Sequence, residues 1–248
     1  MNSNWHEEAY YTIRTYEIDS KKQATLPALV KLMHESAMQH VIKLGVSVWD
    51  LEPHHISWVL MRQQLFVHRL PRLGEQIKIE TYPSGYERLF TYRDYKVYDA
   101  AGELIAHSSS TWVLMDTVQR SLARFPGFIL EMLQLAPAPE LCLPRPSGQL
   151  PKMEKTDHSL DFVVRWHDLD YNDHLNNMYY LQWMLEALPD ELLISGRLRA
   201  FDIQYRAEAQ WKDQVRAEVQ HLPNGRMLHR LIRPDDGKEL ALALSEWE

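Results

Sequence analysis

The strongest constraint on the fold is an internal repeat, because a chain that carries one pattern twice is expected to build two similar units. Gly102 and Gly237 each lie in a polar turn that precedes a strand-like run, and these runs reach Trp112 and Trp247. Both pairs lie 135 positions apart (237 − 102 and 247 − 112). A shared offset in the same order predicts a duplicated unit, with a hairpin at each glycine turn.

A second match supports the duplication and places its boundary. Residues 75–77 (Glu-Gln-Ile) and 213–215 (Asp-Gln-Val) lie 138 positions apart (213 − 75). Between the halves, five of the 13 prolines fall between Pro137 and Pro151, and such a stretch suits a semi-rigid linker. We expect three segments: an N-terminal unit at 1–134, a linker at 135–152 and a C-terminal unit at 153–248.

Each half also contains one amphipathic helical pattern. In the first half, apolar residues recur at helical spacing over 26–44, with Pro27 suited to the first turn and Gly45 to the C-terminal stop. In the second half the apolar stripe runs over 181–188, and Pro189 ends it. Segments rich in Val, Ile, Tyr and Trp follow both. The pattern predicts α+β units in which one helix packs on a face of an antiparallel sheet.

Composition narrows the class of protein. The chain has 248 residues, 45% of them hydrophobic and 25% charged, which is an ordinary globular balance. It has no run of about 18 apolar residues, so no membrane span is expected. The first residues lack a basic start and apolar stretch, so we expect no secretory signal. A net charge of −7 argues against nucleic acid as a partner. The single cysteine, Cys142, excludes an intramolecular disulfide and fits a reducing cytoplasm.

Chemistry-bearing side chains gather directly before the second predicted helix, at residues 166–177. This stretch contains Asp170, Asn172 and His174, whereas the corresponding first-half stretch, residues 18–24, has no His or Asn. Helix capping would account for a single Asp or Asn, but not for the whole set. A helix start favours developing negative charge, and a histidine can move protons near neutral pH. The asymmetry predicts that the second half carries a catalytic site for a carbonyl compound.

Two other kinds of site fit the sequence less well. A metal site at His167, Asp168 and His174 would lack an HExxH-type helical pair and a nearby cysteine. A serine hydrolase of the usual α/β type needs a G-x-S-x-G elbow, which the sequence does not contain. We therefore expect neither a metal nor a cofactor.

One family shares this arrangement of residues. The run from Asp168 to Asn177, continuing to Tyr180, Trp183 and Glu186, closely resembles the active-site segment of plant and bacterial fatty acyl–acyl carrier protein (ACP) thioesterases. The likeness covers nearly all of residues 10–248. Further similar segments are Arg14–Ile18, His34–His40, Trp58–Arg62 and Ser110–Val113.

The resemblance implies a fold, a reaction and a catalytic set. The fold would be two tandem hot-dog units, in each of which a curved antiparallel sheet wraps one long helix. The reaction would be hydrolysis of the thioester of fatty acyl-ACP, with release of the free fatty acid that ends chain elongation. The catalytic residues would be Asp170, Asn172, His174 and Glu208. We expect the N-terminal unit to supply the acyl-chain pocket, because it lacks this set.

The sequence does not decide which chemical role each of these residues has. Where many plant members carry a cysteine beside the glutamate, this chain has Ala209, so a papain-like mechanism does not apply there. Either Asp170 or Glu208 could activate water, or Asp170 could attack as a nucleophile. His174 would carry the proton, and Asn172 would orient a partner or bind the oxyanion.

The placement of Glu208 depends on local backbone geometry. On an unbroken strand, side chains alternate between faces, so Glu208 would point away from the face that carries Phe201, Ile203 and Tyr205. Glu208 reaches the helix side only if the strand bulges or ends near Ala207.

Two alternatives to ACP-linked hydrolysis remain. The first is an acyl-CoA thioesterase, which would have to bind a nucleotide. The second is a non-catalytic acyl-binding module, which would not need the polar set. Because carrier proteins are acidic, the ACP reading requires a local basic face. Candidates are Arg62, Arg69, Arg72, Arg197, Arg199, Arg206, Lys212 and Arg216. A duplicated chain could act alone, since it already holds two units, or as a homodimer.

Overall fold

The computed structural model describes residues 5–134 and 137–248. It divides the chain into two compact units, residues 1–146 and 147–248, referred to below as unit 1 and unit 2. The division lies inside the Pro-rich segment 135–152. No helix in the described ranges is long and apolar enough to cross a membrane.

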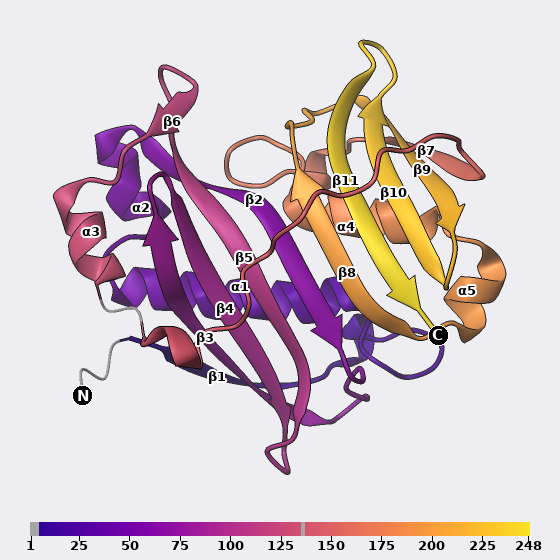
Figure 1. Cartoon of the computed structure of the whole chain (residues 1–248), viewed down its shortest axis with the longest axis horizontal. Coiled ribbons are helices and arrows are strands. Elements are labelled where there is room, and N and C mark those ends of the chain that lie inside the picture. The colour runs from indigo at the N-terminus through magenta and orange to yellow at the C-terminus, as the bar shows by residue number, and fades with distance from the viewer. Residues whose placement is uncertain (1–4, 135–136) are drawn as a thin grey trace. The chain divides into compact units, whose positions relative to one another are not determined.

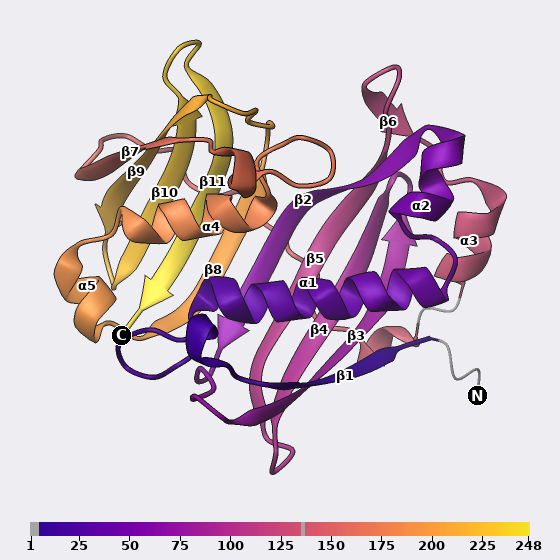
Figure 2. The same ribbon diagram turned by 180° about the vertical axis from the view of Figure 1, so that it is seen from behind.

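Unit 1 is an antiparallel sheet with one long helix on a face (Figures 1 and 2). Its strands run in the order β1-β3-β4-β5-β2, with short β6 beside β5. The strands are β1 (Glu7–Thr12), β2 (Ile56–Val67), β3 (Gln76–Glu87), β4 (Phe90–Asp99), β5 (Leu104–Asp116) and β6 (Ser121–Ala123). The helices are α1 (Leu26–Lys43), α2 (Val48–Leu51) and α3 (Gly127–Leu133), with short 3₁₀ turns at Thr15–Glu17, Glu52–His54 and Pro139–Leu141.

Helix α1 forms where the apolar spacing predicted it. The Thr25 hydroxyl caps its start by accepting a hydrogen bond from the Ala28 N–H at 3.2 Å, and proline occupies the first turn. Gly45 follows its end with a φ of +66°, a left-handed conformation that glycine adopts without strain. Leu29 and Met33 are fully buried against the sheet, so burial of this stripe holds the helix in place.

Unit 2 repeats this plan with fewer residues (Figure 2). Its strand order is β8-β11-β10-β9-β7. The strands are β7 (His158–Val163), β8 (Leu198–Tyr205), β9 (Gln214–Leu222), β10 (Arg226–Arg233) and β11 (Lys238–Trp247), with a 3₁₀ turn at Trp166–Asp168. The helices are α4 (Asn177–Glu186), which lies across the sheet, and α5 (Asp190–Ser195). The predicted stripe at 181–188 overlaps α4, but the helix ends before Pro189, which instead precedes α5.

The two predicted glycine hairpins are present. Gly102, with a φ of +83°, lies in the turn between β4 and β5. Gly237, with a φ of +67°, lies in the equivalent turn between β10 and β11. Both positive φ values belong to the region that favours glycine, which explains why the repeat kept this residue at both turns.

Part of the Pro-rich segment, residues 137–146, is attached to unit 1 rather than being a free spacer. The Tyr82 hydroxyl donates to the Leu141 carbonyl at 2.9 Å, and the Leu143 N–H donates to Asp94 Oδ2 at 2.7 Å. Asp94 is fully buried, and this burial raises the pKa of its carboxyl. Residues 137–146 are therefore fastened to unit 1 through hydrogen bonds to β3 and β4.

Candidate active site

The predicted site is built on the loop that enters α4. Asp168 is buried, and Arg165 reaches its Oδ1 with a guanidinium nitrogen at 2.9 Å. Although burial works to raise it, the hydrogen bonds from Arg165 hold the pKa of Asp168 below its usual value. This ion pair anchors the entrance of the loop, and the Asn176 side chain caps α4 by accepting from the Met178 N–H at 3.0 Å.

Asp170 closes the loop from within. Its Oδ1 accepts hydrogen bonds from the backbone N–H groups of Asn172 at 2.8 Å and His174 at 3.3 Å. The Asp170 N–H in turn donates to the His174 carbonyl at 2.8 Å. Asp173 has a φ of +59°, which an Asp in such a turn tolerates. Asp170 therefore holds the backbone of His174 at both its N–H and its carbonyl group.

His174 and Glu208 come into direct contact. His174 Nε2 lies 3.3 Å from Glu208 Oε2, and the two side chains are 18% and 40% exposed. The backbone supports this approach: His174 forms a β-bridge with Gln210, and the Leu175 N–H donates to the Ala209 carbonyl at 2.8 Å. A half-buried imidazole beside a carboxylate is an arrangement that can take a proton from water and pass it on.

A break in strand β8 allows Glu208 to face the histidine. The strand ends at Tyr205, and the N–H groups of Arg206 and Ala207 both donate to the Leu240 carbonyl, at 2.9 and 3.1 Å. Two successive residues that share one acceptor form a bulge, which changes the face of the side chains that follow. The strand therefore both ends and bulges near Ala207, which is the condition under which Glu208 can reach the helix side of the sheet.

Asn172 contributes differently from the other three residues. Its backbone N–H serves the Asp170 loop, while its side chain is exposed to solvent. The structure therefore brings His174 and Glu208 together, connects Asp170 to the backbone of His174, and leaves the Asn172 side chain exposed. Within residues 5–134 and 137–248, no group of three His, Cys, Asp or Glu side chains is arranged to hold a metal ion.

Unit 1 contains the same loop without the reactive side chains. Asp19 Oδ1 accepts from the N–H groups of Lys21 at 2.8 Å and Gln23 at 3.2 Å, and the Asp19 N–H donates to the Gln23 carbonyl at 2.9 Å. Gln23 forms a β-bridge with Arg72, as His174 does with Gln210. The Asp is therefore common to both units, whereas His174 is replaced by Gln23.

The matching backbone contacts also locate the counterpart of Glu208. The Ala24 N–H donates to the Pro71 carbonyl at 2.8 Å, as the Leu175 N–H does to the Ala209 carbonyl. Pro71 thus corresponds to Ala209, and the residue before it, Leu70, corresponds to Glu208. At this loop, unit 2 has a contact between imidazole and carboxylate and unit 1 has none, in agreement with the predicted asymmetry.

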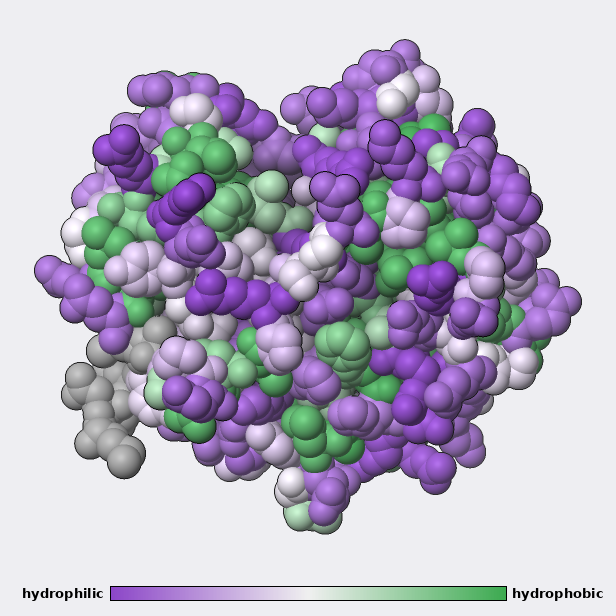
Figure 3. Space-filling view, in the orientation of Figure 1, coloured by the Kyte–Doolittle hydropathy of each residue, from purple (hydrophilic) through white to green (hydrophobic). Residues whose placement is uncertain are grey.

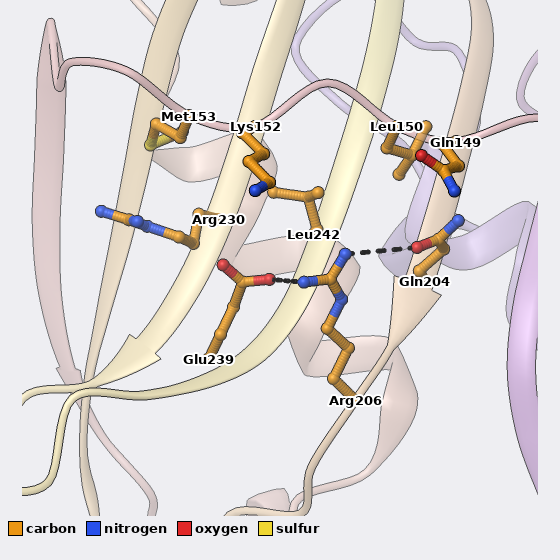
Figure 4. A pocket seen from close by; sticks show the side chains of 9 residues that line it. All are labelled: Gln149, Leu150, Lys152, Met153, Gln204, Arg206, Arg230, Glu239 and Leu242. Carbon is orange, nitrogen blue, oxygen red and sulfur yellow. Dashed lines mark hydrogen bonds and ion pairs between the residues drawn. The ribbon is translucent and has the colours of Figure 1, made fainter.

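A pocket in unit 2 is separate from this chemistry. It has a volume of about 520 Å³. Its lining residues are Gln149, Leu150, Lys152, Met153, Gln204, Arg206, Arg230, Glu239 and Leu242. Figure 4 shows Arg206 in this pocket, paired with Glu239 and directed toward Gln204. Neither His174 nor Glu208 lines it. Figure 3 shows the same side of unit 2 as a mixture of hydrophilic and hydrophobic residues.

Comparisons with known proteins agree with the predicted family. The model described as the acyl-ACP thioesterase N-terminal domain matches residues 4–133, and the model of the C-terminal domain matches residues 151–248. The chain is 28% identical over 253 residues to a chloroplastic palmitoyl-ACP thioesterase of Cuphea hookeriana, covering 96% of this chain and 61% of the relative. It is 29% identical over 230 residues to oleoyl-ACP thioesterase 2 of Arabidopsis thaliana, covering 87% and 63%. The chain therefore spans about three fifths of the length of these relatives.

Solved structures share the fold. The 12:0-ACP thioesterase from Umbellularia californica matches with a TM-score of 0.86 and 23% identity, over 98% of this chain and 97% of that one. An acyl-ACP thioesterase from Bacteroides thetaiotaomicron matches with a TM-score of 0.88 and 21% identity, over 99% and 98%. The predicted α+β class, with two tandem hot-dog folds, is confirmed.

Proposed function

The chain belongs to the acyl-ACP thioesterase family, and from this premise we propose that it hydrolyses the thioester of a fatty acyl-ACP and releases the free fatty acid. The observation that carries the proposal is the contact of His174 with Glu208 at the loop that enters α4. It occurs in the unit that carries the predicted polar set and is missing from the same loop of unit 1.

The geometry supports a mechanism in which water is the nucleophile. Glu208 and His174 together would take a proton from a water molecule, whose oxygen adds to the thioester carbonyl carbon. The exposed amide of Asn172 would donate to the oxyanion. When the C–S bond breaks, His174 returns the proton to the thiolate leaving group, and the products are a thiol and a fatty acid. Asp170 would hold the backbone of His174.

One turnover comparison tests the proposal. Thiol release should be measured from acyl-ACP and acyl-CoA substrates that carry the same acyl chain. Faster turnover of the ACP substrate would support the proposal. Equal or faster turnover of the CoA substrate would instead identify an acyl-CoA thioesterase. Binding of acyl groups without thiol release from either substrate would identify a non-catalytic acyl-binding module.

The carrier protein needs a basic surface, and many of the candidate cations are already paired. Arg206 pairs with Glu239, Arg216 with Asp161, and Arg69 with Glu75 and Asp99. Lys212 instead lies 4.3 Å from the ring centre of exposed Trp211, which follows Gln210, the bridge partner of His174. We propose Lys212 as a cation that steers an acidic carrier toward the site.

Reversal of the charge at Lys212 should act on binding rather than on chemistry. Lys212→Glu is expected to raise KM for the acyl-ACP substrate several-fold at low salt, with little change in kcat. The effect should shrink as salt is added, because screening acts over about 8 Å at physiological ionic strength. Arg216→Glu, at a cation already paired with Asp161, is the matched control. If both variants alter KM for ACP and for a short pantetheine thioester equally, Lys212 does not steer the carrier.

Cys142 should not be needed for thioester hydrolysis. Cys142 Sγ contacts the Ser84 carbonyl in unit 1, and burial, reinforced by Asp94, raises the pKa of its thiol. A raised pKa leaves little thiolate at neutral pH, so alkylation should be slow. Cys142→Ser is expected to keep turnover within about twofold of the unmodified chain, and iodoacetamide should not abolish it. Inactivation that Cys142→Ser prevents would contradict this prediction.

Two further parts of the proposal concern location and the acyl chain. We propose a cytoplasmic location on the basis of the single cysteine, although the names of the plant relatives place those proteins in chloroplasts. We also propose that residues 1–134 supply the acyl-chain pocket, because this unit lacks the reactive pair. A structure with a bound acyl analogue would test that placement.

A further inference from the structure

Glu208 is held by a residue whose role neither the polar cluster nor the resemblance assigns. Tyr180 lies in the first turns of α4 and is only 2% exposed. Its hydroxyl donates to the Ala207 carbonyl at 3.0 Å and accepts from the Ala209 N–H at 3.0 Å. One buried oxygen thus bridges the two residues that flank Glu208.

This bridge lies just beyond the end of the β8 ladder. The segment after Tyr205 has left the ladder of β8 through the bulge at Arg206 and Ala207, so its later peptide groups need other partners. Burial raises the pKa of Tyr180, which keeps its hydroxyl protonated and able to donate and accept at once. Tyr205 packs edge-on against the Tyr180 ring, with 5.6 Å between ring centres, and fixes its direction.

Unit 1 provides an internal control for this arrangement. Leu29 is the fourth residue of α1, as Tyr180 is the fourth residue of α4, and it has no hydroxyl. Pro71, the counterpart of Ala209, has no N–H to donate. Leu70 stands in place of Glu208. The hydroxyl and the N–H donor of the bridge are therefore both absent from the unit that lacks the carboxylate, whereas the Asp19 loop is retained.

We propose that Tyr180 is a positioning residue for Glu208. Its hydroxyl fixes the Ala207 and Ala209 peptide groups, and thereby directs the carboxylate toward His174 Nε2. The proposal rests on the proposed function for its kinetic consequences. A misplacement of about 1 Å at a reacting group can cost up to about a hundredfold in rate, so a lost hydroxyl can have a measurable effect.

The test compares variants that differ by one oxygen atom. Tyr180→Phe keeps the ring and its packing, and is expected to lower kcat by about tenfold with KM changed far less, because the variant misplaces Glu208 without altering substrate binding. Tyr205→Phe is the matched control, since its hydroxyl donates to the Asn177 carbonyl at 3.4 Å and does not contact the peptides around Glu208. It should retain kcat within about twofold.

Two further measurements separate positioning from general destabilisation. In a Glu208→Gln background, Tyr180→Phe should lower kcat little further, because the carboxylate that it positions is already gone. Equal losses in both backgrounds would overturn the proposal, as would an unchanged kcat. Ala209→Pro, which copies Pro71 of unit 1, removes the N–H donor while keeping Tyr180. It should lower kcat to a similar extent, and it provides the test if Tyr180→Phe does not fold.

Amide hydrogen exchange tests the bridge without any assay of activity. The Ala209 N–H should exchange slowly in the unmodified chain and faster in Tyr180→Phe, while the Leu175 N–H stays protected in both. Unchanged exchange at Ala209 would overturn the proposal. If the unmodified chain released no thiol from any acyl thioester, the proposed function would fail, and the exchange result would still decide whether the bridge exists.

Discussion

Replacing Glu208 by glutamine is expected to lower kcat by about a hundredfold or more, with little change in KM, since general acid–base groups contribute on that order. Glutamine has the same shape but cannot accept a proton from water, and it removes the anion 3.3 Å from His174 Nε2. Folding should be retained, because the side chain is 40% exposed. Single-turnover measurement with acyl-ACP and a melting curve for each variant would check both expectations.

His174→Ala should produce a loss of similar size, on the order of a hundredfold, for the same reason. The double variant should be little worse than either single one, because the two side chains act as a unit. His167→Ala is the matched control: this histidine is exposed and lies in the same stretch, but its side chain is not part of the pair. Near-normal turnover in a well-folded His174→Ala chain would rule out the assignment.

Asp170→Ala is also expected to lower kcat on the order of a hundredfold, in this case through displacement of His174. The loss should be recovered for the most part in Asp170→Asn. An asparagine oxygen can accept from the N–H groups of Asn172 and His174 as the carboxylate does, so the loop would be preserved. Rates and melting temperatures of both variants would be compared.

The Asp170 series also decides between two mechanisms. If Asp170 were the nucleophile or the base, Asp170→Asn would be as inactive as Asp170→Ala. Asp19 supports the positioning role, because it makes the same hydrogen bonds in a unit without His174 and Glu208. Asp19→Ala in unit 1 is the matched control: it should lower the melting temperature by a comparable amount while leaving kcat nearly unchanged.

Much of the fold could be predicted because its causes are local or repetitive. The glycines at 102 and 237 adopt positive φ values that favour this residue, and the apolar spacing of α1 follows the helical period over its whole length. The end of α4 could be predicted less closely from the sequence, since the apolar stripe continues to 188 while the helix ends at Glu186. Periodicity reports the buried face, and does not report where backbone hydrogen bonds change partner.

The sequence by itself determined the duplication, the α+β class, the family and the half that carries the polar set, because composition, spacing and motifs are properties of the chain alone. Tertiary structure decided how those side chains lie relative to one another. The bulge after Tyr205 brings Glu208 to His174, and no local pattern reveals the shared Leu240 carbonyl that causes it. The roles proposed for Asp170 and Tyr180 likewise depend on which backbone groups their oxygens contact, and for Tyr180 those groups lie far away in the sequence.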